Sequence, residues 1–366
     1  MVEVARTDDV DSLRGATAAL AERFGAPQAV VAFKEGDLPA VTALRRQYAC
    51  PGRGVEELRH FLDKYHMIRR VTEAGVPAPA FAAVDSPQDV LAFGSAHGWP
   101  LIVKPRRGSA SQGVVRLDGP DGVTDLELKV PSLVQVYVPD PTFHVDGVFD
   151  GRHLRAWRAS RYVNSCLAFT TGSPLGSVEV DDPRLLEHLR QFTERALRAL
   201  SEDPYVFHLE LFVADEDSAA PRLRFLEVGC RVGGAEIPFL WREVHGIDLM
   251  TVEWALQTGE PPVLPAQPDS AEVGGWLLMP VELPRPCLIT AATSLIGTDP
   301  CLYAERVPPV GQVIPAADAY YEHVAGRFRF RGGDSAEVEA AVTGTASRFR
   351  LDARPLPRTA AKASRS

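Results

Sequence analysis

Two neighbouring apolar runs, each carrying one glutamate, place the tightest constraint on the fold of this chain. Glu210 lies in "HLELF", Glu227 lies in "RFLEVG", and a polar segment separates the two runs. The runs predict two strands, and pairing as a hairpin would put both carboxylates on one face of a sheet. Two such carboxylates repel each other unless a cation lies between them. The pattern indicates a Mg²⁺ site; salt bridges to Arg222 or Arg224 are the alternative.

Helical and extended patterns are intermixed along the chain rather than strictly alternating. This mixture favours α+β lobes over a single doubly wound sheet. A hairpin is expected over residues 143–162, turning at Asp150-Gly151. Strands are also expected in "PLIVKP", "VVRL" and "LVQVYV". Helices are expected at residues 11–24, 55–75, 87–98, 183–200, 246–260 and 335–348.

Composition excludes several classes of protein. The 366 residues, 45% hydrophobic and 24% charged, are typical of a globular protein with two or three domains. The net charge of −9 argues against nucleic acid as the main partner. Five scattered cysteines without a CxxC pair indicate neither a disulfide framework nor a zinc site. No apolar run is long enough to span a membrane, and the acidic start lacks a signal-peptide pattern, so a cytoplasmic location is expected.

A lysine followed by small residues suggests a phosphate site. Lys104 lies near the end of "PLIVKP", which leads into "RRGSASQGV". Small residues let backbone N–H groups approach phosphate oxygens, and the ammonium supplies charge. A surface turn is the alternative, and Lys64 in "LDKYHMIRR" reads by itself as a solvated helix charge. The small residues are Gly108, Ser109, Ser111 and Gly113.

Taken in order, these features resemble the ATP-grasp superfamily, and most closely its carboxylate–amine ligases for amino acids and peptides. The resemblance covers roughly residues 29–350 and implies two α+β lobes that grip ATP. Because only "AVVAF" and at most one further strand precede Lys64, we expect a shortened N-terminal α/β lobe. The expected division is residues 1–62 for that lobe, 63–135 for the small lobe, 136–262 for the large lobe, 263–355 for its C-terminal part and 356–366 for a tail.

The resemblance also implies a role for each candidate residue. Lys64 and Lys104 correspond to lysines that contact ATP phosphates in the superfamily. The loop from Gly108 to Gly113 corresponds to a mobile loop that closes over these phosphates. Glu210 and Glu227 would hold Mg²⁺ or Mn²⁺. Arg231, with Lys104, would act on the transferring phosphoryl group. The adenine and ribose contacts would be Gln135 through its side chain, the Val136 carbonyl, Tyr137, the Val138 amide and His144.

The motifs also depart from the pattern of the superfamily. Gly229 stands where many members have an asparagine, so it supplies no third oxygen to the metals. Gln135 stands where an acid is common. Substrate contacts are expected from arginines on the predicted hairpin and from an aromatic residue after "GGAEIP"; a solvated strand face and core packing are the alternatives. These residues are Arg155, Arg158, Arg161 and Trp241.

The expected activity is the ATP-dependent ligation of a small-molecule carboxylate to an amine through an acyl phosphate. Two alternatives stay open: a nucleotide-binding protein without ligase activity, which Gly229 favours, and a carboxylase or purine-pathway enzyme of the same superfamily. We expect no nucleic-acid or membrane partner. The sequence leaves a homodimer open.

Overall fold

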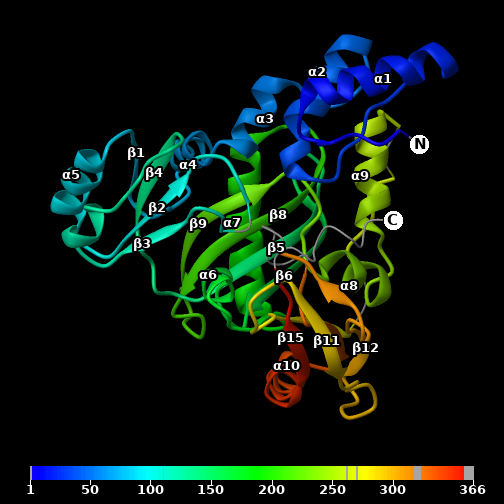
Figure 1. Ribbon diagram of the computed structural model, residues 1–366. Coiled ribbons are helices and arrows are strands. Elements are labelled where there is room, and N and C mark those ends of the chain that lie inside the picture. The colour runs from blue at the N-terminus through cyan, green and yellow to red at the C-terminus, as the bar shows by residue number, and fades with distance from the viewer. Residues whose placement is uncertain (1, 110, 261–262, 269–270, 317–322, 358–366) are drawn as a thin grey trace.

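The computed structural model describes all residues except 1, 110, 261–262, 269–270, 317–322 and 358–366, so most of the expected tail lies outside it (Figure 1). Its centre is an eight-stranded sheet in the order β12-β14-β10-β7-β6-β5-β8-β9. Three of the strands beyond residue 263 belong to this sheet. The strands are β5 (Thr142–Phe149), β6 (Leu154–Tyr162), β7 (Leu175–Glu179), β8 (Tyr205–Ala214), β9 (Arg222–Gly229), β10 (Val273–Met279), β12 (Leu302–Arg306) and β14 (Gly326–Gly332).

A smaller lobe precedes this sheet in the chain and lies beside it (Figure 1). It contains a four-stranded sheet in the order β1-β4-β2-β3, with α5 (Pro87–His97) packed against it. A capping box formed by Ser86 and Asp89 starts α5, and its buried Val90 enters an apolar core with Leu101. The strands are β1 (Phe81–Val84), β2 (Leu101–Pro105), β3 (Val115–Leu117) and β4 (Ser132–Val136), with the short helix η2 (Pro120–Val123) after β3.

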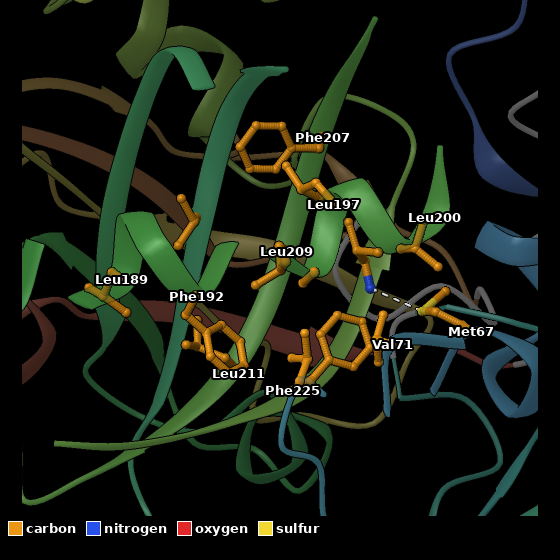
Figure 2. Packing of buried hydrophobic residues seen from close by; sticks show 14 of the residues in the cluster. Met67, Val71, Leu189, Phe192, Leu197, Leu200, Phe207, Leu209, Leu211 and Phe225 are labelled. Carbon is orange, nitrogen blue, oxygen red and sulfur yellow. Dashed lines mark hydrogen bonds between the residues drawn. The ribbon is translucent and has the colours of Figure 1, made fainter. Parts of the chain in front are cut away.

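Helices cover both faces of the eight-stranded sheet. The buried stripe of α7 (Pro183–Leu200) packs on one face, where Figure 2 shows Leu189, Phe192 and Leu197 beside sheet residues. On the same face α10 (Ser335–Arg348) covers β7, β10 and β14. The opposite face packs against α8 (Ile237–Glu243) and α9 (Leu249–Thr258). Among the described residues, none of the helices combines the length and hydropathy needed to cross a bilayer. The chain also contains α6 (Cys166–Thr170) and a small sheet of β11 (Cys287–Ala292), β13 (Val313–Ile314) and β15 (Leu351–Pro355).

The N-terminal segment is helical, so its predicted α/β character is wrong. Its elements are α1 (Val10–Phe24), η1 (Glu35–Asp37), α2 (Leu38–Tyr48) and α3 (Val55–Leu62), and no strand occurs among residues 2–62. The apolar run 29–33 has no neighbouring strand to pair with. Instead, the side-chain amide of Gln257 in α9 accepts from Ala32 N–H at 3.0 Å and donates to the Ala32 carbonyl at 2.8 Å. This pairing anchors the segment to the large lobe.

The helix predicted over residues 55–75 is two helices. Asp63 separates α3 from α4 (Lys64–Glu73), because its carboxylate caps α4 by accepting from the N–H groups of Tyr65 and His66. Asp63 also binds Arg106 bidentately, at 3.0 and 2.7 Å, so the break in the helix is tied to the segment after β2. The break brings Lys64 to the first turn of a helix instead of the middle of one.

Packing of α4 against β9 brings the first lysine to the second glutamate. Met67 and Val71 are fully buried in the core shared with α7 and the sheet (Figure 2). The dashed line in Figure 2 marks the Val228 N–H donating to the Met67 sulfur at 3.3 Å. Because Val228 follows Glu227 directly, this contact fixes the start of α4 beside the Glu227 carboxylate.

Candidate active site

A cavity of about 480 Å³ lies between the small lobe and the eight-stranded sheet. Its volume is within the range of sites that enclose a small ligand such as a nucleotide. The small lobe contributes β2, the loop after it and the end of β4, while the large lobe contributes β6, β8 and β9. Of the predicted site residues, the lining includes Lys64, Lys104, Gly108, Ser109, Ser111, Gln135, Val136, Tyr137, Val138, Arg161, Glu210 and Glu227.

The two glutamates are direct cross-strand partners, as the hairpin prediction required. Lys64 forms an ion pair with Glu227, with Nζ 3.0 Å from Oε2. The Tyr162 hydroxyl donates a hydrogen bond to Glu210 Oε1 at 2.7 Å. Burial acts to raise the pKa of Glu210, but the His208 imidazolium beside it outweighs burial and lowers the pKa to about 2. Ionised carboxylates on one face that already attract a cation are the hard oxygen donors that Mg²⁺ prefers. These residues fit a divalent cation.

The two lysines differ in their surroundings. Lys64 donates to the Gly108 carbonyl at 2.7 Å as well as contacting Glu227, so it links the loop after β2 to β9. Lys104 is only 5% exposed, and burial lowers its pKa to about 8 against the attraction of Glu227. A lysine with a lowered pKa in a cleft is typical of a functional site.

The end of β4 offers polar and apolar contacts for a flat ligand. The Tyr137 N–H donates a hydrogen bond to the Pro100 carbonyl at 3.1 Å, and this bond holds the backbone extended along the cavity. Gln135 is buried, and its side-chain amide nitrogen has no hydrogen-bond partner among the described residues. An unpaired buried amide is costly, so a ligand acceptor at this position would be favourable. Ile102 and Leu226 add apolar walls.

His144 does not fit the expected ribose contact. It is 1% exposed, lies outside the cavity lining, and bonds to Asp146 at 2.5 Å and to the Ser177 hydroxyl at 2.7 Å. Asp146 also binds His208 Nδ1, at 2.8 Å. These are hydrogen-bond lengths, too short for a metal ion between the groups. A Cβ at Gly233 would lie 2.4 Å from Asp146 Oδ1, so only glycine lets the loop after β9 cover this cluster.

The predicted substrate residues do not gather in one place. Arg155 is exposed beside Asp150, at 3.9 Å, whereas Arg161 lines the cavity and pairs with Glu339 at 2.5 Å. A spacing of three residues in a strand turns Arg158 to the opposite face, where it meets His245 at 3.4 Å. Trp241 is 2% exposed in the core, so the packing alternative describes its position.

Gly113 and Arg231 are also absent from the cavity lining, although Gln112 and Val114, on either side of Gly113, belong to it. The Arg231 guanidinium donates through Nε to Glu35 at 3.0 Å. Sequence reasoning missed Glu35, Asp146, Tyr162 and His208. Glu35 pairs with Arg231, Tyr162 with Glu210 and Asp146 with His208, at separations of 196, 48 and 62 residues, so no local pattern in the sequence marked these contacts.

Comparison with known proteins supports this picture. No protein-family model matches the chain. It is 24% identical to the L-arginine-specific L-amino acid ligase of Bacillus subtilis over 289 residues, which are 74% of this chain and 68% of that protein. It is 26% identical to the D-alanine–D-alanine ligase of Streptomyces griseus over 136 residues, 34% of this chain and 31% of that one.

Solved structures show the same fold. An L-amino acid ligase from Bacillus licheniformis superposes with a TM-score of 0.75 at 16% identity, covering 96% of this chain and 86% of that chain. A biotin carboxylase from Campylobacter jejuni, solved as a complex with β-γ-ATP, gives a TM-score of 0.64 at 16% identity, covering 95% and 79%. These likenesses show that the chain has the ATP-grasp fold and is similar in sequence to ligases that act on amino acids.

Proposed function

We propose that this protein is an ATP-dependent, ADP-forming ligase that joins a carboxylate to an amine on amino-acid-like substrates. The observation that carries the proposal is the pair of glutamates in register, opposite Lys64 and Lys104, in a cavity of nucleotide size. The names of the curated relatives, both amino-acid ligases, support a C–N bond as the product.

In the first step, an oxygen of the substrate carboxylate attacks the γ-phosphorus of ATP. The bond to the β-phosphate oxygen breaks, and ADP leaves with the electron pair. Positioning and charge balance do most of the catalysis in such transfers. Lys104 and Lys64 would hold the phosphates, and Gln135 with the end of β4 would hold the base. Glu210 and Glu227 would bind Mg²⁺ or Mn²⁺, which supplies positive charge to the phosphate oxygens when bound.

In the second step, the amine attacks the acyl carbon of the acyl phosphate. The C–N bond forms, the bond from the acyl carbon to the phosphate oxygen breaks, and the amine loses a proton. Arg231 would balance charge on the departing phosphate, since a guanidinium matches phosphate geometry. Tyr162 donates to Glu210 and so keeps this carboxylate oriented during both steps.

The ligase is tested by ATP-dependent phosphate release with amino acids supplied singly and in pairs. We expect release only with particular pairs, together with a product whose mass equals the two substrates minus water. The Glu227→Gln protein, purified in parallel, controls for contaminating ATPases. Nucleotide binding without turnover for any pair would contradict the ligase and favour the nucleotide-binding alternative that Gly229 raises.

Nucleotide binding should depend on pH through Lys104. Its pKa is about 8, so its attraction for phosphate is present below pH 8 and lost as the pH rises through that value. Above pH 8 we expect the Kd for ADP to rise by up to about tenfold per pH unit, because binding the anion takes up the missing proton. Calorimetry of ADP binding between about pH 7 and 10 measures this.

The matched control for this prediction is Lys104→Arg. A guanidinium keeps its charge throughout this pH range, so the variant should bind ADP with little change above pH 8. An equally steep rise of Kd in the arginine variant would assign the pH dependence to another group.

We also propose that the enzyme works in the cytoplasm on small-molecule substrates, with no nucleic-acid partner. All five cysteines are free thiols, as suits a reducing compartment. The net charge of −9 disfavours binding to a nucleic-acid backbone. A homodimer stays a prediction.

A further inference from the structure

Glu35, from the N-terminal helical segment, pairs with Arg231, which follows the strand β9 that carries Glu227. It lies in η1, and its Oε2 accepts from Arg231 Nε at 3.0 Å. The side chains of Glu35 and Arg231 are only 15% and 22% exposed. An ion pair that is this well shielded from water is a specific contact, unlike the surface pairs elsewhere in the chain.

A side chain at position 229 would crowd this contact. A Cβ built on Gly229 would lie 3.3 Å from Glu35 Oε2, 3.3 Å from Arg231 Cγ and 3.4 Å from Arg231 Nε. Arg231 therefore runs back along the strand over Gly229, and Glu35 meets it there. The glycine that lacks an oxygen for the metals leaves room for a carboxylate brought from another part of the chain.

Charge ties this pair to the rest of the cleft. Burial lowers the pKa of Arg231, but Glu35 outweighs it and raises the pKa, with smaller contributions from Glu227 and Glu210. After Glu227, Glu35 is the carboxylate that most raises the pKa of Lys64. Glu35 thus lies among the cations that we assign to the phosphates.

The segment that carries Glu35 is held rigidly. Three residues earlier, both backbone groups of Ala32 bond to the Gln257 side chain, and Gln257 also binds the buried Arg45. Within η1, Asp37 N–H donates to the Lys34 carbonyl at 3.0 Å. A carboxylate on a segment anchored in this way arrives preorganised, which is what a residue that positions another side chain requires.

We propose that Glu35 is a positioning residue of the phosphoryl-transfer site, which holds the Arg231 guanidinium across Gly229. Arg231 Nε is bound by Glu35 and Nη1 donates to the Val232 carbonyl at 2.9 Å. Arg231 Nη2 makes no hydrogen bond within the described part of the chain. Two fixed nitrogens orient the planar group, and the third remains to donate to a phosphoryl oxygen. The role of Arg231, though not its geometry, rests on the proposed function.

The direct test measures binding of ADP with and without aluminium fluoride, which mimics the transferring phosphoryl group. We expect Glu35→Ala to bind ADP like the wild type but to lose about 10- to 100-fold of the extra affinity that fluoride confers, the range for a charge-assisted hydrogen bond. Glu35→Gln should lose less, because its amide oxygen can still accept from Arg231 Nε. Asp37→Asn, in the same turn and bonded on the surface to Thr7, is the matched control.

A double-mutant cycle with Arg231→Lys separates positioning from a direct role. Because Glu35 acts through Arg231, adding Glu35→Gln to Arg231→Lys should cost little beyond the single arginine change. The proposal would be overturned if the losses of fluoride-dependent affinity from the two single variants simply added in the double variant. It would also be overturned if Glu35→Ala kept the full gain in affinity that fluoride confers. These measurements need no acceptor substrate. Failure of ligation with every amino-acid pair would therefore refute the proposed ligase activity. The effect of the Glu35 variants on ADP and fluoride binding could still be interpreted.

Discussion

Replacing Glu227 by glutamine is expected to reduce ligation turnover by roughly a thousandfold, since losing one ligand charge removes several kcal/mol of transition-state stabilisation. Glu227 is in register with Glu210 and lies 3.0 Å from the Lys64 ammonium. The amide keeps the shape of the side chain but not its charge. It therefore weakens the hold on a divalent cation and leaves Lys64 without its ion-pair partner.

The fold should survive this change, because it also relieves the repulsion between two carboxylates directly opposite each other. Thermal unfolding checks the fold, and Mn²⁺ binding in the presence of ADP checks the metal role without turnover. Glu127→Gln is the control, as its carboxylate is 72% exposed and paired with Lys129 on the surface. Unchanged Mn²⁺ affinity together with normal turnover would refute the assignment of Glu227.

Asparagine in place of Asp146 is expected to lower the free energy of unfolding by about 3–5 kcal/mol, the usual cost of removing one partner of a buried ion pair. Asp146 is 2% exposed and binds His144 at 2.5 Å and His208 at 2.8 Å. The amide cannot satisfy both imidazoles as an ionised carboxylate does. Chemical denaturation of the two proteins measures the difference, with the exposed Asp118→Asn as control.

The loss of stability caused by Asp146→Asn should depend on pH in a defined direction. Despite burial, Asp146 raises the pKa of His208 to about 10, and the two histidines lower the pKa of Asp146 far below its usual value. His208 thus contributes stability fully below its unfolded pKa of about 6.5, and that contribution is lost as the pH rises towards 10. The contribution of Asp146 is present above about pH 4 and is lost as the pH falls.

The cost of Asp146→Asn should therefore be largest between about pH 4 and 6.5 and should shrink towards pH 10. Unfolding at several pH values, repeated on a His208→Gln background, isolates the pair. The asparagine change should cost much less on that background. A cost that is the same at every pH, with or without His208, would show that the pair does not stabilise the fold through charge.

The sequence by itself determined the features that depend on neighbouring residues. The alternation around Glu210 and Glu227 predicted a hairpin with both carboxylates on one face, and the structure pairs these residues directly. The strand that contains Lys104 and the small-residue loop after it were also predictable, since a period of two and turn residues are local signals. The order of these local signals was enough to predict the ATP-grasp fold.

Tertiary structure alone decided where the charges meet. Lys64 contacts Glu227 because Asp63 breaks a helix and Met67 anchors the next one to β9. The arginines at 155, 158 and 161 lie in different environments, because strand pairing sets which face of the sheet is covered at each position. Contacts across long chain separations leave no period in the sequence, as shown by Glu35 with Arg231, 196 residues apart, and Asp146 with His208, 62 apart. Gly229 was read as a missing ligand, and packing made it the space in which two distant charges pair.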